Sequence, residues 1–177
     1  MGTLKLNLPT ILTLSRIVLI PVFVFTVYPN PLLGTLVFAI ASLTDSLDGY
    51  FARRSGEVTK FGIILDPIAD KFLIISALVV LVDMERLPAW IAITLIVRDF
   101  LVTGLRVVAL SKDIIIPAEL GGKLKTTLQI SAILCLILMR NITFIDLYDL
   151  GIILISIALV LSIVSGIRYT ITFWEKI

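Results

Sequence analysis

The chain has 177 residues, of which 59% are hydrophobic and 16% are charged, and its formal net charge at pH 7 is +2. A mean hydropathy of +1.11 excludes an ordinary soluble domain and indicates a polytopic membrane protein. With a single cysteine and no histidine, the chain has no intramolecular disulfide and lacks the usual zinc ligand and general base. Acid–base or metal chemistry must therefore rest on carboxylates.

Hydropathy divides the chain into six apolar segments, each near the ~20 residues that a helix needs to cross a bilayer. They run over residues 8–28, 32–53, 62–82, 88–110, 122–140 and 147–171. The connectors are short and carry turn residues or charges, as in Tyr28-Pro29-Asn30-Pro31 and in Met84 to Pro88. None is long enough for a second domain. We therefore expect an all-α polytopic membrane protein with six transmembrane helices, forming one domain over residues 1–177.

Basic residues are distributed unevenly between the two sets of segment ends. Nine lie at one set: Lys5, Arg53, Arg54, Lys60, Lys112, Lys123, Lys125, Arg168 and Lys176. Only Arg86 and Arg140 lie at the other. Positive residues are enriched on the cytoplasmic side of membrane proteins, so both termini are expected to be cytoplasmic. We expect a multi-pass protein of the inner (plasma) membrane, with its active site facing the cytoplasm. Lys112 and Lys125 are expected to be anchors that snorkel to the headgroups.

Four aspartates lie near the predicted cytoplasmic ends of the second and third segments: Asp45, Asp48, Asp66 and Asp70. The first pair is three residues apart and the second pair four, so each pair shares one helical face. Carboxylates in a bilayer are costly, and four aimed at one place would repel each other unless cations bind. Hard divalent cations, Mg²⁺ or Mn²⁺, suit such oxygen ligands, and two ions held together are typical of phosphoryl transfer.

Small and basic residues are interleaved with these aspartates. Gly49 follows Asp48 and leaves room for a ligand, while Gly62 begins the third segment and permits close helix approach or ligand access. Ala52 and Arg53 complete a turn on the same face, and a guanidinium binds phosphate oxygens in bidentate fashion. The four aspartates could instead be helix caps or solvated surface residues, but that interpretation does not explain their spacing.

The stretch from Asp45 to Asp70 resembles the signature of the CDP-alcohol phosphotransferase family, D-x2-D-G-x2-A-R-x8-G-x3-D-x3-D, at every fixed position. The resemblance implies an integral membrane enzyme of six helices, usually a homodimer. Such enzymes transfer a phosphatidyl or similar group from a CDP-linked donor to an alcohol and release CMP. The resemblance also implies that Asp45, Asp48 and Asp66 are mainly metal ligands, and that Asp70 lies at the metal site and is the general base.

The resemblance also implies which residues line the pocket for cytidine diphosphate: Gly49, Ala52 and Arg53, to which we add Gly62. Asn7-Leu8-Pro9-Thr10, at the start of the first segment, has two interpretations. In one, Asn7 and Thr10 contact the cytidine diphosphate. In the other the stretch is only an entry cap, because Asn or Thr caps a helix and Pro fits its first turn.

Cationic residues later in the chain bear on the second substrate. Arg98 and Arg106 are eight residues apart, a little over two helical turns, so they share roughly one face. Lys123 follows at the same predicted side of the membrane. Converging cations beside a metal site favour an acceptor alcohol that carries its own phosphate. Asp99 has two interpretations: it is the charge partner of these arginines, or it is a member of a structural ion pair.

Further segments resemble the phosphatidylglycerophosphate synthase branch of the family: Asn7 to Thr10 with Arg16, Arg98-Asp99 with Gly104-Leu105-Arg106, and Gly122 to Thr126. In that branch the donor is CDP-diacylglycerol and the acceptor is sn-glycerol 3-phosphate. By this resemblance, Arg98, Arg106 and Lys123 are the candidates for binding the acceptor's phosphate.

The alternatives fall into two classes. Within the family, the acceptor is instead inositol phosphate or phosphatidylglycerol. Outside it, a cation-coupled transporter also carries intramembrane carboxylates, but such folds more often show broken helices or inverted repeats. The expected partners are the two substrates, membrane lipid and a second copy of the chain, with no nucleic acid. Ser162 and Gly166, four residues apart, are expected to let the last helix pack closely against another.

Overall fold

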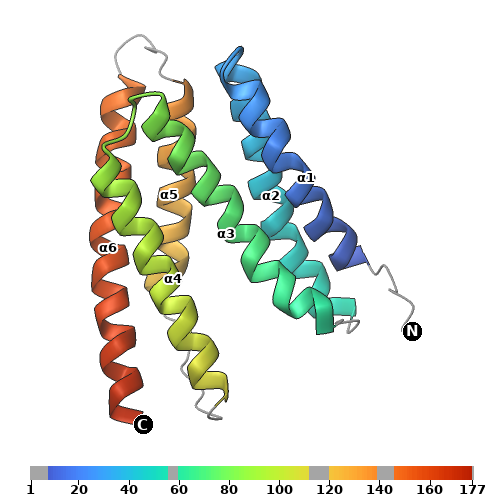
Figure 1. Cartoon of the computed structure of the whole chain (residues 1–177), viewed down its shortest axis with the longest axis vertical. Helices are drawn as coiled ribbons and strands as arrows, with labels where there is room; N and C mark the ends of the chain where they lie inside the picture. The colour runs from blue at the N-terminus through green and yellow to red at the C-terminus, as the bar shows by residue number, and fades with distance from the viewer. Residues whose placement is uncertain (1–7, 56–59, 112–119, 139–145, 177) are drawn as a thin grey trace. The chain divides into compact units, whose positions relative to one another are not determined.

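A computed structural model describes residues 8–55, 60–111, 120–138 and 146–176. These residues form six α-helices and no strand, which confirms the expected all-α class. The helices are α1 (Leu8–Val27), α2 (Pro31–Ser55), α3 (Lys60–Asp83), α4 (Ala89–Ser111), α5 (Leu120–Leu138) and α6 (Leu147–Lys176), as Figure 1 shows. Each coincides with one apolar segment of the sequence.

The largest difference from the expected boundaries is at the end of α6. The helix continues to Lys176, five residues past the predicted end at 171. Hydropathy marks where the apolar run ends, whereas the helix continues with aromatic residues. Phe173 is buried, and Trp174 is 70% exposed. Tryptophan is typical of the membrane–water interface, where a helix leaves the hydrocarbon without unwinding.

The chain divides into two compact units, Met1–Val80 and Leu81–Ile177. In the first unit α1 packs against α2. The rings of Phe23 and Phe38, both fully buried, lie with their centroids 5.6 Å apart. Asn30 caps α2 by accepting a hydrogen bond from the backbone N–H of Leu33, and Pro31 occupies the first helical position, where its missing N–H has no consequence.

Gly34 brings α1 and α2 together. A Cβ at this position would lie 2.6 Å from the Cα of Val27, which is a backbone atom and cannot move aside easily. The absence of a side chain therefore sets the distance between the two helices just after the turn that joins them.

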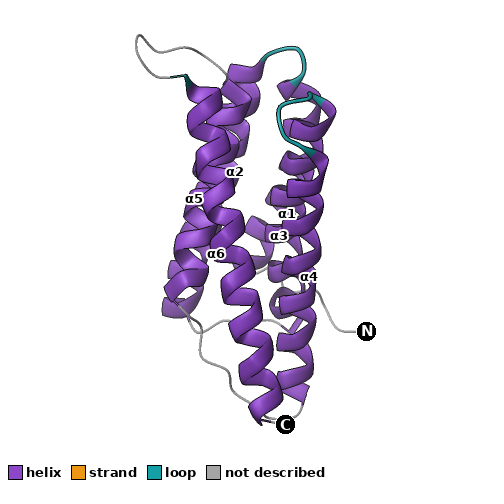
Figure 2. Cartoon of the chain, turned by 90° about the vertical axis from the view of Figure 1, so that its left-hand side faces the viewer, coloured by secondary structure: helices purple, strands orange, loops and turns teal. Residues whose placement is uncertain are grey.

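In the second unit, α6 packs against both α5 and α4. α4 and α6 run in the same direction and α5 runs opposite to them, as the colour gradient in Figure 1 shows; Figure 2 gives the view from the side. Buried Leu136 of α5 lies against Gly151 of α6, where a Cβ would come within 2.7 Å of the Leu136 Cγ. Aliphatic side chains such as Leu95, Ile133 and Ile155 complete this core.

The turn between α3 and α4 also supports α5. Glu85 has a φ of 56° and ends α3 in the left-handed conformation, with Arg86 N–H bonded to the Leu81 carbonyl at 2.9 Å. The Arg86 guanidinium then donates to the carbonyls of Ile137, at 2.6 Å, and Leu136, at 3.3 Å. These carbonyls end α5, where a cation is favourable. Desolvation by partial burial lowers the pKa of Arg86.

Among the described residues, one helix, over Leu147–Glu175, is by itself long and apolar enough to cross a membrane. Shorter apolar stretches lie at Ile17–Val27, Pro31–Thr44 and Leu124–Leu138. α4 carries Arg98, Asp99 and Arg106 within its apolar sequence. The six-span topology and the cytoplasmic termini therefore stay predictions.

The close approach at Gly34 predicts that Gly34→Ala destabilises the protein. The added methyl group would overpack α1 against α2, which costs about 1–3 kcal/mol. Gly104→Ala is the matched control, because nothing lies within 4 Å of its Cβ position and alanine favours a helix. Thermal unfolding in detergent, followed by circular dichroism, should show a lower Tm for the first variant only. Equal Tm values for both would contradict the packing argument.

Candidate functional site

The acidic segment lies on two consecutive helices. Asp45 and Asp48 belong to α2, Asp66 and Asp70 belong to α3, and only residues 56–59 separate the helices. The helical placement predicted from the sequence is thus confirmed, and each pair shares a helical face. These side chains lie outside those that the structure describes, so their convergence on one point stays a prediction.

The other residues of the predicted donor pocket fall on three helices: Gly49, Ala52 and Arg53 on α2, Gly62 on α3 and Thr10 on α1. Their side chains, like that of Lys123 on α5, are also outside the described set. Asn7 lies outside the described residues altogether. The roles of these residues therefore rest on the sequence.

The donor atoms available for a metal ion are carboxylate oxygens. Among the described side chains, no group of three or more histidines, cysteines, aspartates or glutamates could hold an ion. The four aspartates of α2 and α3 were not in that set. Four carboxylates in two pairs, each pair on one helical face, match the hard oxygen ligands that Mg²⁺ and Mn²⁺ prefer. The residues present therefore fit a divalent metal site by their chemistry and their spacing.

An ionic network in the second unit joins α4 to α5. Oδ1 of Asp99 accepts hydrogen bonds from Nη1 of Arg98, at 3.0 Å, and from Nζ of Lys125. All three groups are largely removed from water: the Lys125 side chain is 6% exposed, and those of Arg98 and Asp99 are 17% and 18% exposed. Charges are tolerated at such depth when they are paired. The expectation that Asp99 pairs with an arginine is confirmed for Arg98.

Arg98 extends this network to α6. Its Nε donates to the backbone carbonyl of Ser162 at 2.7 Å, and its Nη2 donates to the hydroxyl of Ser165. The side chain passes over Gly166, where a Cβ would lie 3.0 Å from Nε and 3.3 Å from Cγ of the arginine. Ser162 and Gly166 were expected to let α6 pack closely against another helix; they face α4 of the same chain, and the space at Gly166 is taken by the Arg98 side chain.

The position of Lys125 corrects one expectation. The sequence predicted that its ammonium would snorkel to the headgroups, but Lys125 is 5% exposed and bonds to Asp99. A fixed carboxylate on the neighbouring helix replaces the water that a snorkelling side chain would reach. Lys112, for which the same role was predicted, lies outside the described residues.

Arg106 makes a second contact between α4 and α6. Its guanidinium carbon lies 5.9 Å from the centroid of the Tyr169 ring, within the range of a cation–π interaction. Tyr169 is buried, whereas Arg106 is exposed. Because Arg98 and Arg106 both contact α6, the prediction that they share one face of α4 is confirmed.

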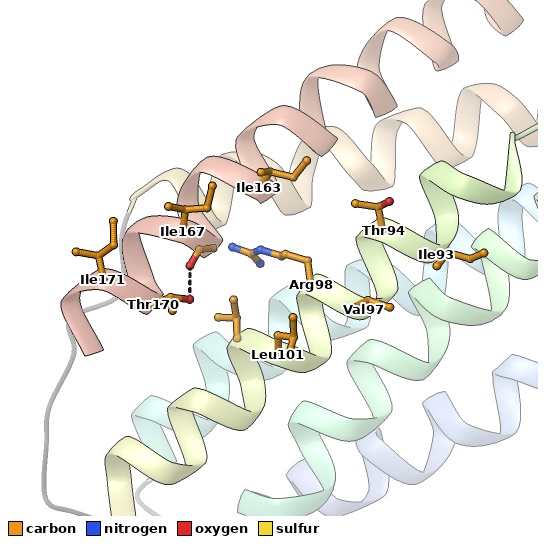
Figure 3. A pocket seen from close by; sticks show the side chains of 11 residues that line it. Ile93, Thr94, Val97, Arg98, Leu101, Ile163, Ile167, Thr170 and Ile171 are labelled. Carbon is orange, nitrogen blue, oxygen red and sulfur yellow. Dashed lines mark hydrogen bonds between the residues drawn. The ribbon is translucent and has the colours of Figure 1, made fainter. Parts of the chain in front are cut away.

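A groove of about 530 Å³ lies between α4 and α6. Its lining is mostly aliphatic, and Figure 3 shows Arg98 crossing it from α4 toward α6 among Val97, Ile163 and Ile167. Thr170 turns its hydroxyl to the Gly166 carbonyl, at 2.9 Å, so its polar atom is satisfied within α6. Arg98 is thus a charged side chain in apolar surroundings, which strengthens its electrostatic contacts.

Sequence reasoning missed two polar residues of these helices. Ser165 binds Arg98, and Gln129 of α5 is 2% exposed, with no hydrogen-bond partner for its Nε2 among the described residues. Gln129 lies one turn after Lys125, on the same side of α5. The available signal was a polar residue inside an apolar segment, which marks an interior-facing position in a membrane helix.

Comparisons with known proteins cover nearly the whole chain. The family model described as CDP-alcohol phosphatidyltransferase matches residues 6–164. A Bacillus subtilis protein named CDP-diacylglycerol–glycerol-3-phosphate 3-phosphatidyltransferase is 38% identical, over 97% of this chain and 97% of that protein. A protein of the same name from Rickettsia bellii is 40% identical, over 92% of this chain and 93% of that protein. Another from Haemophilus influenzae is 39% identical, over 94% of this chain and 92% of that protein.

The Arg98 contacts predict that Ser165→Ala destabilises the second unit. The variant removes a hydrogen bond to a charged group, which contributes about 1.5–3 kcal/mol. Ser156→Ala is the matched control on the same helix, because the Ser156 hydroxyl donates only to the Ile152 carbonyl of its own helix, at 2.7 Å. Thermal unfolding in detergent should give a clearly lower Tm for Ser165→Ala. A larger effect from the control would show that Arg98 does not tie the helices together.

Proposed function

The chain belongs to the CDP-alcohol phosphatidyltransferase family, and from this premise we propose that it transfers the phosphatidyl group of CDP-diacylglycerol to sn-glycerol 3-phosphate. The products are phosphatidylglycerophosphate and CMP. As a member of this family the protein is a transferase. The observation that carries the proposal is the unbroken D-x2-D-G-x2-A-R-x8-G-x3-D-x3-D pattern on α2 and α3. The names of relatives that align with at least 92% of the chain support the choice of acceptor.

Enzymes of this family generally use divalent metal ions. In the proposal, the carboxylates of Asp45, Asp48, Asp66 and Asp70 hold two ions, Mg²⁺ or Mn²⁺. When bound, the ions neutralise the diphosphate and stabilise the charge that develops on the leaving CMP. Protein groups complete the donor pocket: Gly49, Ala52, Arg53, Gly62, Asn7 and Thr10. Among these, Arg53 supplies a guanidinium for phosphate oxygens.

The proposed reaction is a direct in-line displacement. The acceptor hydroxyl gives its proton to Asp70, and its oxygen bonds to the phosphorus that carries the lipid. The bond from that phosphorus to the oxygen bridging it to CMP breaks, and CMP leaves with that oxygen. No covalent nucleophile is needed, which suits a chain without histidine and with a single cysteine, Cys135.

The acceptor's own phosphate requires fixed cations. We assign Arg98, Arg106 and Lys123 to it. Hydrogen bonds to Asp99, Ser162 and Ser165 use three of the N–H groups of Arg98. A guanidinium has five, so contacts among the described residues leave two N–H groups to point at an anion while the other three fix the side chain in place. A fixed donor of this kind binds an anion with little loss of side-chain entropy.

The proposal includes the membrane arrangement. The family is membrane-associated, and we infer six spans in the inner (plasma) membrane, both termini in the cytoplasm, and a site open to that side. The asymmetric distribution of basic residues supports the orientation. We take residues 1–177 as one catalytic domain that works as a homodimer.

CMP release from CDP-diacylglycerol by purified protein tests the reaction. With Mg²⁺ present, sn-glycerol 3-phosphate should support turnover, whereas inositol 1-phosphate, inositol, serine and phosphatidylglycerol should not. Asp70→Asn should lower kcat by about a hundredfold or more, because it removes the general base. Asp149→Asn, an exposed aspartate in the first turn of α6, is the control and should leave the rate unchanged.

The acceptor panel separates the alternatives. Turnover with another acceptor only would keep the family chemistry and overturn the assigned substrate. No CMP release with any acceptor, from protein that unfolds cooperatively, would overturn the transfer reaction and favour the transporter alternative. Undiminished turnover by Asp70→Asn would remove that residue from its proposed role.

Removal of divalent metal should abolish CMP release, and Mg²⁺ or Mn²⁺ should restore it. The physical reason is that a diphosphate beside four carboxylates is strongly repelled unless cations compensate the charge. The measurement is CMP release after chelation with EDTA and after titration of each metal back. Asp45→Asn should raise the metal concentration needed for half-maximal activity. Full activity in EDTA would contradict the proposed metal site.

A further inference from the structure

One carboxylate in the second unit connects all three of its long helices. Asp99 of α4 binds Lys125 of α5 directly. It also binds Arg98, whose guanidinium reaches the Ser162 carbonyl and the Ser165 hydroxyl of α6. Neutralising this one carboxylate would therefore loosen two cations and the contacts of two helices at once.

The burial of Lys125 determines what its contact with Asp99 contributes. At 5% exposure the ammonium has little water around it. A buried ammonium that loses an anionic partner carries a desolvation penalty of several kcal/mol. The bond to Asp99 therefore helps to hold the Lys125 Nζ in its buried position.

Asp99 therefore acts by direct contact on one of the residues assigned to the acceptor's phosphate, Arg98. Lys125 bonds to the same carboxylate oxygen and so helps to keep Asp99 in place.

We propose that Asp99 is a positioning residue for the phosphate of the acceptor. It holds Arg98 in place, and Lys125 bonds to the same carboxylate oxygen; neither Asp99 nor Lys125 touches the reactants. This inference rests on the proposed function. The opposite role is also defined by the geometry: a carboxylate beside two cations could instead weaken their attraction for a phosphate. Positioning predicts weaker acceptor binding when Asp99 loses its charge, whereas a mere counter-charge predicts tighter binding, so the sign of the change decides.

The test compares five variants of the full-length protein: Asp99→Asn, Asp99→Glu, Lys125→Met, Asp99→Asn with Lys125→Met, and the control Asp149→Asn. At saturating CDP-diacylglycerol, the KM for sn-glycerol 3-phosphate should rise about five- to thirtyfold in Asp99→Asn and in Lys125→Met. The KM for CDP-diacylglycerol should stay unchanged. The double variant should be no worse than the worse single variant, because both remove the same interaction. Asp99→Glu should recover much of the affinity.

Three results would overturn the inference: a lower KM for the acceptor in Asp99→Asn, an equal rise of both KM values, or additive effects in the double variant. Thermal unfolding of each variant shows that a changed KM comes from folded protein.

Calorimetric binding of sn-glycerol 3-phosphate, without CDP-diacylglycerol, separates this inference from the proposed function. If the wild type binds this ligand but releases no CMP, the transfer reaction fails, while a weaker Kd in Asp99→Asn still supports the role of Asp99. If the wild type neither binds the ligand nor releases CMP, both fail.

Discussion

Charge inside apolar helices must be compensated, and this constraint governs the second unit in particular. Asp99 sits between Arg98 and Lys125, and all three side chains are largely withdrawn from water. Arg98 and Lys125 contact the same oxygen of this carboxylate. An ion pair alone would be weak evidence for stability, since hydrophobic replacements of such pairs are often neutral or stabilising.

The packing of α6 follows from the same constraint. Arg98 needs acceptors, and it finds them on α6 only because Gly166 leaves space for its side chain to cross. Gly34 has a different role, since it brings two backbones together rather than admitting a side chain. Small residues in membrane helices thus serve either helix contact or the passage of a polar side chain between helices. Spacing alone does not distinguish these uses, whereas the neighbouring atoms do.

The sequence was sufficient for the helices and for the acidic pattern, because hydropathy and fixed spacing are local properties. It was insufficient for Lys125. Its place near a segment end predicts snorkelling, and only the rotation of α5 shows that it faces Asp99, 26 residues earlier. The partners of Arg98 on α6 lie 64 and 67 residues later, beyond any local pattern. The pairing of Arg98 with Asp99 was predictable because the two residues are adjacent.

Both substrates of the proposed reaction are anionic, and they need positive charge for different reasons. Two unit charges 4 Å apart repel by about 1 kcal/mol in water and by about 4 kcal/mol at the lower effective dielectric near a protein surface. Binding a diphosphate and a phosphate close together therefore requires positively charged groups beside each of them. On the donor side the charge must stabilise a leaving group, which suits ions recruited by the aspartates of α2 and α3. On the acceptor side the phosphate does not react and only has to be held, which suits cations fixed by hydrogen bonds. Arg98, held by Asp99, Ser162 and Ser165, is such a cation. In the proposed function, the chain thus combines acidic residues that would acquire positive charge by binding metal with basic residues such as Arg98, which a carboxylate keeps in place.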